Sequence, residues 1–201
     1  MRALPYRHSF APMLSLTLMV GNLRLLSYYL TMIQVLFICL GNICRSPMAE
    51  AVFRRLVAQA GLENKIDILS AGTSQWHVGE EAHRGTLAVL RRAGIAHHGR
   101  ARQVTATDLR VADYVIAMDQ DNIFDLQRLD TRGDLAGKVY RLLEFAPPNF
   151  PRDVPDPYYD NNFDYTYKLV EAGCRGLLAF VQERLNGDLR AKTGDRRPET
   201  G

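Results

Sequence analysis

Short apolar runs that alternate with longer amphipathic segments are the feature that most constrains how this chain can fold. Four runs have the length and apolarity of buried β-strands, at residues 35–39, 66–71, 113–118 and 139–143. Segments with apolar residues at helical spacing follow them and predict helices at 47–61, 80–94, 120–129 and 163–185. This alternation predicts an α/β fold with a single domain, in which a four-stranded parallel twisted sheet carries helices on both faces. Ligands are expected at the carboxyl ends of the strands.

Composition and charge exclude several classes of protein. The chain has 201 residues, of which 47% are hydrophobic and 23% are charged, so it can bury a substantial core and is neither disordered nor collagen-like. Lys and Arg number 25 against 22 Asp and Glu. The resulting net charge of +3 is spread along the chain and forms no basic block. We therefore expect no nucleic-acid partner.

The cysteines indicate a reactive thiol and not a disulfide framework. There are three, Cys39, Cys44 and Cys174, with no C-x-x-C pair and no histidine at zinc-ligand spacing. An odd number of irregularly spaced cysteines suits a reducing compartment. We therefore expect a cytoplasmic protein without a metal site.

The two ends of the chain differ from its middle. Residues 1–32 contain basic residues followed by an apolar run at Phe10–Val20, which leaves three interpretations: a signal or anchor, a packed N-terminal extension, or a start assigned upstream of the true one. We favour the last, because Met32 directly precedes a strand-like run. The sequence thus predicts a folded domain at 33–186 and a flexible tail at 187–201, with membrane association only if the first segment is a genuine anchor.

The segment CLGNICRSP, residues 39–47, predicts a phosphate-binding loop after the first strand. It places a cysteine at the end of a buried strand, an arginine six positions later and a helix start directly afterwards. Gly41 and Asn42 tolerate positive φ, so the loop can curl until its backbone N–H groups point inward. The helix that follows adds the positive end of its dipole. A tetrahedral oxyanion fits such a loop.

Three side chains of this segment suggest chemistry. Cys39 would lie where the N–H groups, the helix terminus and Arg45 all favour an anion, and would act as a thiolate nucleophile. Arg45 presents a planar fork that can hold two phosphate oxygens. Ser46 can donate its hydroxyl to the Cys39 sulfur, or act as an ordinary helix N-cap, and the two roles are compatible. The alternative for the whole segment is a buried strand cysteine before a capping loop.

A second segment, residues 153–160, can supply a proton to a leaving group. It is a loop of carboxylates and aromatic residues interrupted by prolines, and Asp156 stands between Pro155 and Pro157. We expect Asp156 to be the general acid. The alternative is ordinary Asp-Pro turn chemistry. The adjacent tyrosines favour the catalytic interpretation, because they can wall a pocket for an aromatic substrate.

Together, C-L-G-N-I-C-R-S-P and the downstream D-P-Y-Y resemble the motifs of the low-molecular-weight protein-tyrosine phosphatases, over about residues 33–186. The resemblance implies a phosphoric monoester hydrolase that needs no cofactor and hydrolyses phosphotyrosine through a phosphocysteine intermediate. It implies that Cys39 is the nucleophile, that Arg45 binds phosphate, and that Asp156 is the acid that later activates water. The implied partner is a phosphotyrosine-containing protein, with tyrosine kinases among the candidates.

The resemblance also implies supporting residues. The loop between Cys39 and Ser46 would surround the phosphate, so that substrate meets the residues Leu40, Gly41, Asn42, Ile43 and Cys44. A hydrogen-bonded network of Asn42, Ser46 and Ser70 would hold the loop. The family often completes this network with a histidine before an A-R-Q tripeptide, but here that position is Gly99, and His98 comes one residue early.

Further implied residues frame the pocket. Trp76 and Tyr158 would grip the phenyl ring of the substrate, and Asp119, at the end of the third strand, would support the site. A cysteine at the position of Cys44 can form a reversible disulfide with the nucleophile Cys39 in this family; the alternative is a small buried residue without a redox role. Cys174 is expected in the core.

Three competing functions are less compatible with these residues. Arsenate reductases on the same scaffold need a further cysteine pair after the third strand, and none lies between Cys44 and Cys174. Protein-arginine phosphatases usually carry Thr where this chain has Ile43, and an apolar side chain suits a phenyl phosphate better than a guanidinium. A phosphate-binding module without activity would not need the thiol, the arginine and the aspartate together.

Overall fold

The strand that carries the cysteine at its end lies inside a parallel sheet. The computed structural model describes residues 32–193, with side chains described up to residue 187. Strand β1 (Ile33–Cys39) pairs in parallel with β2 (Ile66–Gly72) on one side and with β3 (Tyr114–Ala117) on the other. Strand β4 (Val139–Arg141) pairs in parallel with β3, so that the strand order is β2-β1-β3-β4. The predicted four-stranded parallel sheet is confirmed.

Alternation along β1 explains why both faces of the sheet are covered. Successive side chains of a strand point to opposite faces. Val35 and Phe37 accordingly join one buried cluster, whereas Leu36 and Ile38 join another. All four side chains are at most 2% exposed. A strand that is apolar on both faces requires helices on both faces.

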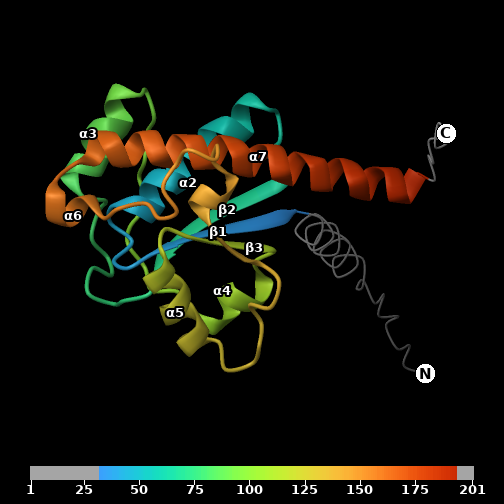
Figure 1. Ribbon diagram of the computed structural model, residues 1–201, viewed down its shortest axis with the longest axis horizontal. Coiled ribbons are helices and arrows are strands. Elements are labelled where there is room, and N and C mark those ends of the chain that lie inside the picture. The colour runs from blue at the N-terminus through green and yellow to red at the C-terminus, as the bar shows by residue number, and fades with distance from the viewer. Residues whose placement is uncertain (1–31, 194–201) are drawn as a thin grey trace, which may run out of the picture. The chain divides into compact units, whose positions relative to one another are not determined.

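Helices supply that cover (Figure 1). On one face lie α2 (Arg45–Gln59) and α7 (Phe163–Thr193), with α3 (Arg84–Arg92) packed beside them. On the other face lie α4 (Ala106–Val111) and α5 (Gln120–Leu129), whose buried leucines pack against β1 and β3. The predicted arrangement of helices on both faces is therefore confirmed. None of the helices within residues 32–193 has the length and apolarity needed to cross a membrane.

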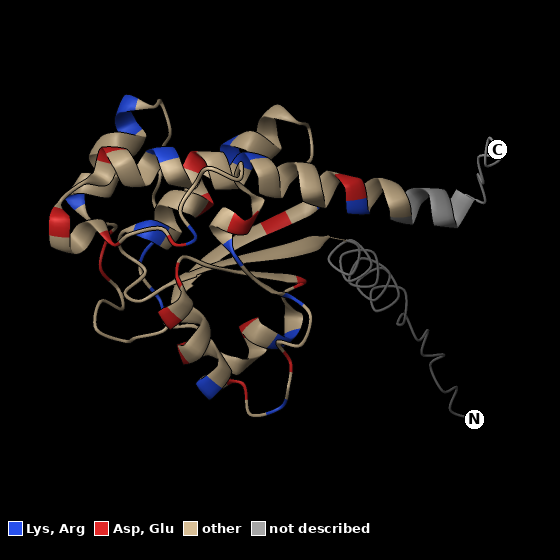
Figure 2. Cartoon of the chain, in the orientation of Figure 1, with Lys and Arg blue, Asp and Glu red and all other residues tan. Residues whose placement is uncertain are grey.

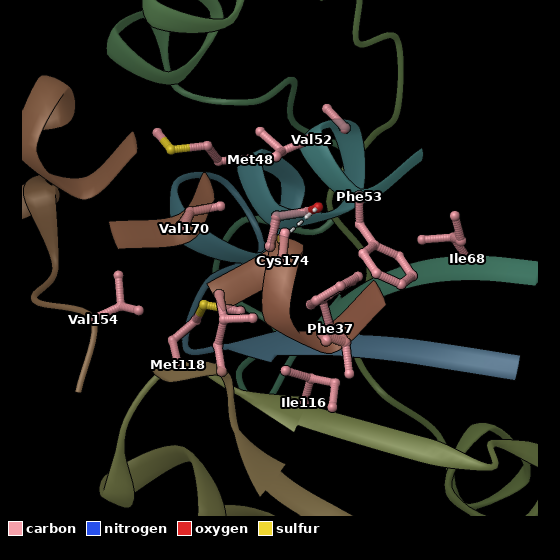
Figure 3. Close-up of a cluster of buried hydrophobic side chains, with 14 of the residues drawn as sticks. Phe37, Met48, Val52, Phe53, Ile68, Ile116, Met118, Val154, Val170 and Cys174 are labelled. Atoms are coloured by element: carbon pink, nitrogen blue, oxygen red, sulfur yellow. Dashed lines mark hydrogen bonds between the residues drawn. The ribbon is translucent and has the colours of Figure 1, made fainter. Parts of the chain in front are cut away.

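The larger cluster packs α2 and α7 onto the sheet (Figure 3). Phe37 and Phe53 meet edge to face, with ring centroids 5.5 Å apart. Cys174 is fully buried on α7, as expected for a core residue, and its thiol contacts the Ala49 carbonyl oxygen at 3.7 Å. Burial raises the pKa of the Cys174 thiol, so this group stays protonated.

Two helix predictions need correction in the middle of the chain. The helix expected at 80–94 starts only at Arg84. The His83 ring caps this helix by accepting a hydrogen bond from Gly85 N at 3.2 Å. Before the cap, Glu81 pairs with Arg100 in an isolated β-bridge. Helix α4 was not predicted, since its six residues are too few to show a helical apolar stripe. Its capping box, in which Thr105 and Asp108 bond reciprocally, was the readable signal.

The last third of the chain differs in three details. The strand expected to reach residue 143 ends at Arg141, and a 3-10 turn, η1 (Leu142–Phe145), replaces its last residues. Part of the expected carboxylate loop forms the short helix α6 (Pro157–Asp160), with Pro157 at its start. Helix α7 runs to Thr193, eight residues beyond its predicted end, so residues 187–193 of the predicted tail are helical. The remaining tail and the predicted N-terminal extension lie outside the described residues.

The carboxyl ends of the central strands meet at one edge of the sheet. The register pairs Cys39 at the end of β1 with Gly72 at the end of β2. A Cβ on Gly72 would lie 2.7 Å from the Leu40 carbonyl oxygen, so only glycine permits this approach. The segment after β2 is thereby held directly against the loop that follows the cysteine.

Candidate active site

The loop after β1 depends on an unusual backbone conformation at one residue. Of the two residues expected to allow it, only Asn42 has positive φ, at 55°. Asparagine adopts this region more readily than other residues with a side chain. Gly41 is needed for space instead, because a Cβ there would lie 2.8 Å from Cδ2 of His77. Helix α2 then begins at Arg45, two residues before its predicted start, with Cys44 as the N-cap.

The side chain of Asn42 holds the loop from inside. Its Nδ2 donates to Ser46 Oγ and to Ser70 Oγ, both at 2.9 Å, and its Oδ1 accepts from Arg102 N at 2.9 Å. Asn42 is only 3% exposed. These three hydrogen bonds replace the hydrogen bonds to water that the amide loses on burial. The structure brings Asn42, Ser46 and Ser70 together, as the sequence predicts.

This network continues to a residue that the sequence analysis missed. Ser70 Oγ donates to Glu50 Oε2 at 2.6 Å, and Glu50 also pairs with Arg54 one turn along α2. A carboxylate acceptor fixes the hydroxyl proton of Ser70 and leaves its oxygen free to accept from Asn42. The i, i+4 spacing of Ser46 and Glu50 was the only signal in the sequence.

His98 does not complete the network. The hydrogen bonds of Asn42 go to Ser46, Ser70 and a backbone N–H, and His98 lines a shallow surface hollow instead. The one-residue departure from the family pattern at His98 thus goes with a network that does not include this histidine. Asn42 Oδ1 accepts its hydrogen bond from the backbone N–H of Arg102.

The sulfur of Cys39 makes hydrogen bonds with the Ser46 hydroxyl and with one backbone N–H. Ser46 Oγ lies 3.0 Å from Sγ, and Asn42 N donates to Sγ at 3.3 Å. Ser46 is inside α2 and not at its N-cap, so the capping alternative is wrong and its hydroxyl faces the sulfur. Cys39 itself is only 3% exposed, and its thiol is free.

Arg45 gathers two carboxylates beside the loop. Its Nη1 pairs with Asp119 and also donates to the Val154 carbonyl oxygen at 3.0 Å. Its Nη2 pairs with Asp156 Oδ2 at 2.7 Å. Burial lowers the pKa of Arg45, but the negative charges of Cys39, Asp156 and Asp119 outweigh this effect and raise it. The guanidinium therefore keeps its charge although its side chain is 4% exposed.

One atom of Arg45 has no partner. Its Nε is buried and makes no hydrogen bond within the described residues. An anionic ligand in the loop would supply an acceptor for this buried donor. Asp119, besides binding Arg45, caps α5 by accepting from Asn122 N at 2.7 Å, so the sheet edge and the helix fix its position together.

A pocket of about 230 Å³ opens above Cys39. Eight of the predicted residues line it, namely Cys39, Leu40, Gly41, Ile43, Cys44, Trp76, Asp156 and Tyr158. Trp76 and Tyr158 are 73% and 54% exposed, so their rings stand at the mouth. Tyr159, the second of the two adjacent tyrosines expected at the pocket, and His77, which was not predicted, complete the lining. His77 is anchored by Glu80, with Nδ1 and Oε2 2.9 Å apart.

The second cysteine of the loop differs chemically from the first. Burial, together with the charges of Asp156 and Cys39, raises the pKa of Cys44 to about 12. Cys44 is therefore a neutral thiol at physiological pH. Both Cys39 and Cys44 are free thiols in the structure. Among the described residues, no group of three or more histidine, cysteine or acidic side chains is arranged to hold a metal.

Comparison with known proteins gives one family. Residues 34–188 match the family described as low molecular weight phosphotyrosine protein phosphatase. The low molecular weight protein-tyrosine-phosphatase YfkJ of Bacillus subtilis is 50% identical over 153 residues, which cover 76% of this chain and 97% of YfkJ. PtpA of Staphylococcus saprophyticus is 41% identical over 155 residues, 77% of this chain and 97% of that protein.

Solved structures agree with the sequence relatives. The crystal structure of YfkJ superposes with a TM-score of 0.72 at 49% identity, covering 76% of this chain and 96% of that one. DARP, described as drosophila arginine phosphatase, superposes with a TM-score of 0.67 at 29% identity, covering 73% and 96%. The chain therefore belongs to the low-molecular-weight protein-tyrosine phosphatases, a family of hydrolases.

Proposed function

We propose that this chain hydrolyses phosphotyrosine in proteins in two steps, through a phosphocysteine on Cys39. One observation carries the proposal: Cys39 and Asp156, which are far apart in the sequence, line the same pocket, and Arg45 binds Asp156 beside the cysteine loop. A nucleophile and a group able to transfer a proton thus flank the position that a phosphoryl group would take.

In the first step the Cys39 thiolate attacks phosphorus, and the bond from phosphorus to the tyrosine oxygen breaks. Asp156 donates its proton to that oxygen, so tyrosine leaves as a neutral phenol. Arg45 and the loop N–H groups hold the phosphoryl oxygens. In the structure Nη2 of Arg45 binds Asp156 Oδ2 at 2.7 Å. An arriving phosphate takes over this donor, and the released Asp156 carboxylate takes up a proton from solvent before it acts on the leaving group.

In the second step Asp156, now a carboxylate, takes a proton from a water molecule. The resulting hydroxide attacks phosphorus and the S–P bond breaks, which releases inorganic phosphate and restores the thiolate. Ser46 Oγ and Asn42 N, at 3.0 and 3.3 Å from Sγ, stabilise the sulfur as it leaves. Every group in this scheme belongs to the described part of the chain.

The lining of the pocket supports an aromatic substrate. Ile43, Trp76 and Tyr158 present apolar and aromatic surface around the cavity, which suits a phenyl ring better than a guanidinium. The structurally similar DARP is described as an arginine phosphatase. The preferred substrate is therefore tested by comparing a phosphotyrosine peptide with a phosphoarginine peptide of the same sequence. Phosphotyrosine peptide should be hydrolysed with the higher kcat/KM, and a higher value for phosphoarginine peptide would overturn the assignment.

The assignment of Asp156 is tested with aryl phosphates whose leaving groups differ in pKa. In Asp156→Ala, kcat should fall by about 10²–10⁴-fold for phenyl phosphate and much less for 4-nitrophenyl phosphate, because a good leaving group needs no proton. Glu63→Ala, which removes an exposed carboxylate that lines neither the pocket nor its surroundings, is the control and should leave both rates unchanged. Equal losses on the two substrates would show that another residue is the acid.

We also propose that the phosphatase domain spans residues 33–186 and acts in the cytoplasm on phosphotyrosine-containing proteins, tyrosine kinases among them. The three free thiols support a reducing compartment. The match of residues 34–188 to the family supports the domain limits.

A further inference from the structure

A second hollow adjoins the catalytic pocket. It has a volume of about 490 Å³ and lies between the segment that follows β2 and helix α5. Its lining residues are Leu40, Thr73, Ser74, Trp76, Asp125, Arg128 and Leu129. We name this hollow the α5 groove. Leu40 and Trp76 line both the groove and the catalytic pocket, so a polypeptide whose modified side chain fills the pocket passes the groove.

Hydrogen bonds fix the α5 groove relative to Cys39. Thr73 N donates to the Cys39 carbonyl oxygen at 2.9 Å, and Ser74 N donates to the Leu40 carbonyl oxygen at 3.0 Å. On the other side, Thr73 Oγ1 donates to Asp125 Oδ2 at 2.8 Å and so ties the segment to α5. The groove is therefore preformed at a constant distance from the sulfur, which is the requirement for selecting a neighbouring residue of a substrate.

The chemistry of the groove combines apolar surface with one available cation. Trp76 and Leu129 are 73% and 43% exposed and offer apolar area. Arg128 is exposed and makes no hydrogen bond or ion pair within the described residues. Asp125, the acidic residue of the groove, already accepts from Thr73. Along α5, acidic residues (red) lie near the start of the helix and a basic residue (blue) lies near its end (Figure 2). Among the residues that line the groove, Arg128 is thus the one charged side chain that is exposed.

From these observations we propose that the α5 groove binds the substrate chain beside the phosphotyrosine and prefers an acidic side chain there. The carboxylate pairs with the Arg128 guanidinium, and the methylene groups of the acidic residue lie on Trp76 and Leu129. This proposal rests on the proposed function, since it assumes that the phosphotyrosine occupies the catalytic pocket. Arg128 contacts neither the reacting atoms nor the loop, and acts on substrate choice alone.

A neighbouring hollow, which shares Leu40 and Asp125 with the α5 groove, has the opposite character. Five aspartates line it, namely Asp119, Asp121, Asp125, Asp153 and Asp156, with Arg45 as its one basic residue. A basic residue of a substrate would go there and not to Arg128. A general preference for basic peptides is therefore the competing explanation, and the experiment separates the two.

The test measures kcat/KM for phosphotyrosine peptides in which Glu, or Lys in a parallel set, replaces Gln at one of the three positions on either side of the phosphotyrosine. At one position, or two adjacent ones, Glu should raise kcat/KM by about 2- to 5-fold, the strength of an exposed ion pair. In Arg128→Gln the ratio of kcat/KM for the Glu peptide to kcat/KM for the Gln peptide should fall to one. In Arg128→Glu this ratio should fall below one. Because the pair is exposed, raising the ionic strength should bring the wild-type ratio toward one.

Arg91→Gln is the matched control, because Arg91 is likewise exposed in the last turn of its helix and without a partner in the described residues. It should keep the wild-type ratio at every position. The hydrolysis of 4-nitrophenyl phosphate, which does not reach the groove, should be unchanged in Arg128→Gln.

The outcomes separate the two proposals. If Arg128→Gln keeps the Glu preference, if no position prefers Glu, or if basic residues are preferred at every position, the groove proposal is wrong although the phosphatase stands. If wild-type enzyme hydrolyses no phosphotyrosine peptide, the proposed function itself falls.

Discussion

At the scale of single residues, Asn42 combines two properties that other residues do not offer together. Its backbone takes φ 55°, which glycine tolerates better, and its side chain makes three buried hydrogen bonds, which glycine cannot. The loop that holds Cys39 therefore depends on conformation and on hydrogen bonding at the same position. Replacing Asn42 by glycine or by alanine separates the two contributions.

Asn42→Gly keeps the loop conformation and removes the hydrogen bonds, whereas Asn42→Ala also forces a residue with a Cβ into the left-handed region. Placing a residue with a Cβ in the left-handed region costs about 1–2 kcal/mol. Asn42→Ala should therefore lower the free energy of unfolding by about that amount more than Asn42→Gly. Urea titration measures this difference, and both variants should lose kcat, because Ser46 is no longer held against the sulfur. Equal stability of the two variants would show that the backbone at position 42 is unstrained.

At the scale of elements, the contact of α7 with η1 requires small residues on one side of the helix. A Cβ on Gly176 would lie 1.8 Å from the Phe145 carbonyl oxygen, and one on Gly173 would lie 2.6 Å from Cγ of Leu142. Backbone cannot yield as a flexible side chain can. These glycines therefore allow α7 to approach the end of β4 closely, and Cys174 and Leu177 enter the core beside them.

Gly176→Ala should destabilise the protein by about 1–3 kcal/mol or more, because the helix must move away from η1. Gly187→Ala is the matched control on the same helix, where a Cβ would meet nothing within 4 Å. There the better helix propensity of alanine should add about 0.5–1 kcal/mol. Midpoints of urea unfolding should shift in opposite directions for the two variants. A shift in the same direction would contradict the packing of α7 described above.

The capping box of α4 makes a pH-dependent contribution to stability. Burial raises the pKa of Asp108, but hydrogen bonds from Arg102 and Thr105 lower it by more. The pKa of this carboxyl group in the folded protein therefore lies below its usual value. A carboxyl group with a depressed pKa stabilises the fold above its unfolded pKa, and this contribution is lost as the pH falls through the folded pKa.

Asp108→Ala should therefore cost about 1–2 kcal/mol at pH 7, and the difference from wild type should shrink as the pH is lowered to 3. The free energy of unfolding at the two pH values checks this. A difference that stays constant or grows toward pH 3 would show that the charge of Asp108 is not what stabilises α4.

At the scale of the whole molecule, the site is assembled where parallel strands end, and this decides what a sequence can reveal. The loop from Cys39 to Ser46 is contiguous, so its residues, its strand and its helix could be predicted together. Helix α4, by contrast, is too short to show periodicity, and η1 looked like the end of a strand because its leucines are buried. Local patterns thus indicated the sheet and the long helices, and failed for the short elements.

The candidate site follows the same division. Asp156 was expected from its place between two prolines and beside two tyrosines, and the family resemblance agreed. Its ion pair with Arg45 could not be predicted, because it joins residues 111 positions apart. His77 and the N–H of Arg102 were missed, because each reaches the loop through tertiary contacts that no local spacing encodes. Glu50 was missed because its spacing to Ser46 does not indicate that it binds Ser70 on strand β2.

The central claim is that the Cys39 sulfur forms a covalent bond with phosphorus. The most direct test measures phosphate release from a phosphotyrosine peptide, with excess EDTA, by freshly reduced wild-type protein and by Cys39→Ser. Wild type should turn over in the presence of the chelator, and the variant should show no turnover while still binding phosphate, because Arg45 and the loop are intact. Turnover by Cys39→Ser, or none by wild type, would contradict the account.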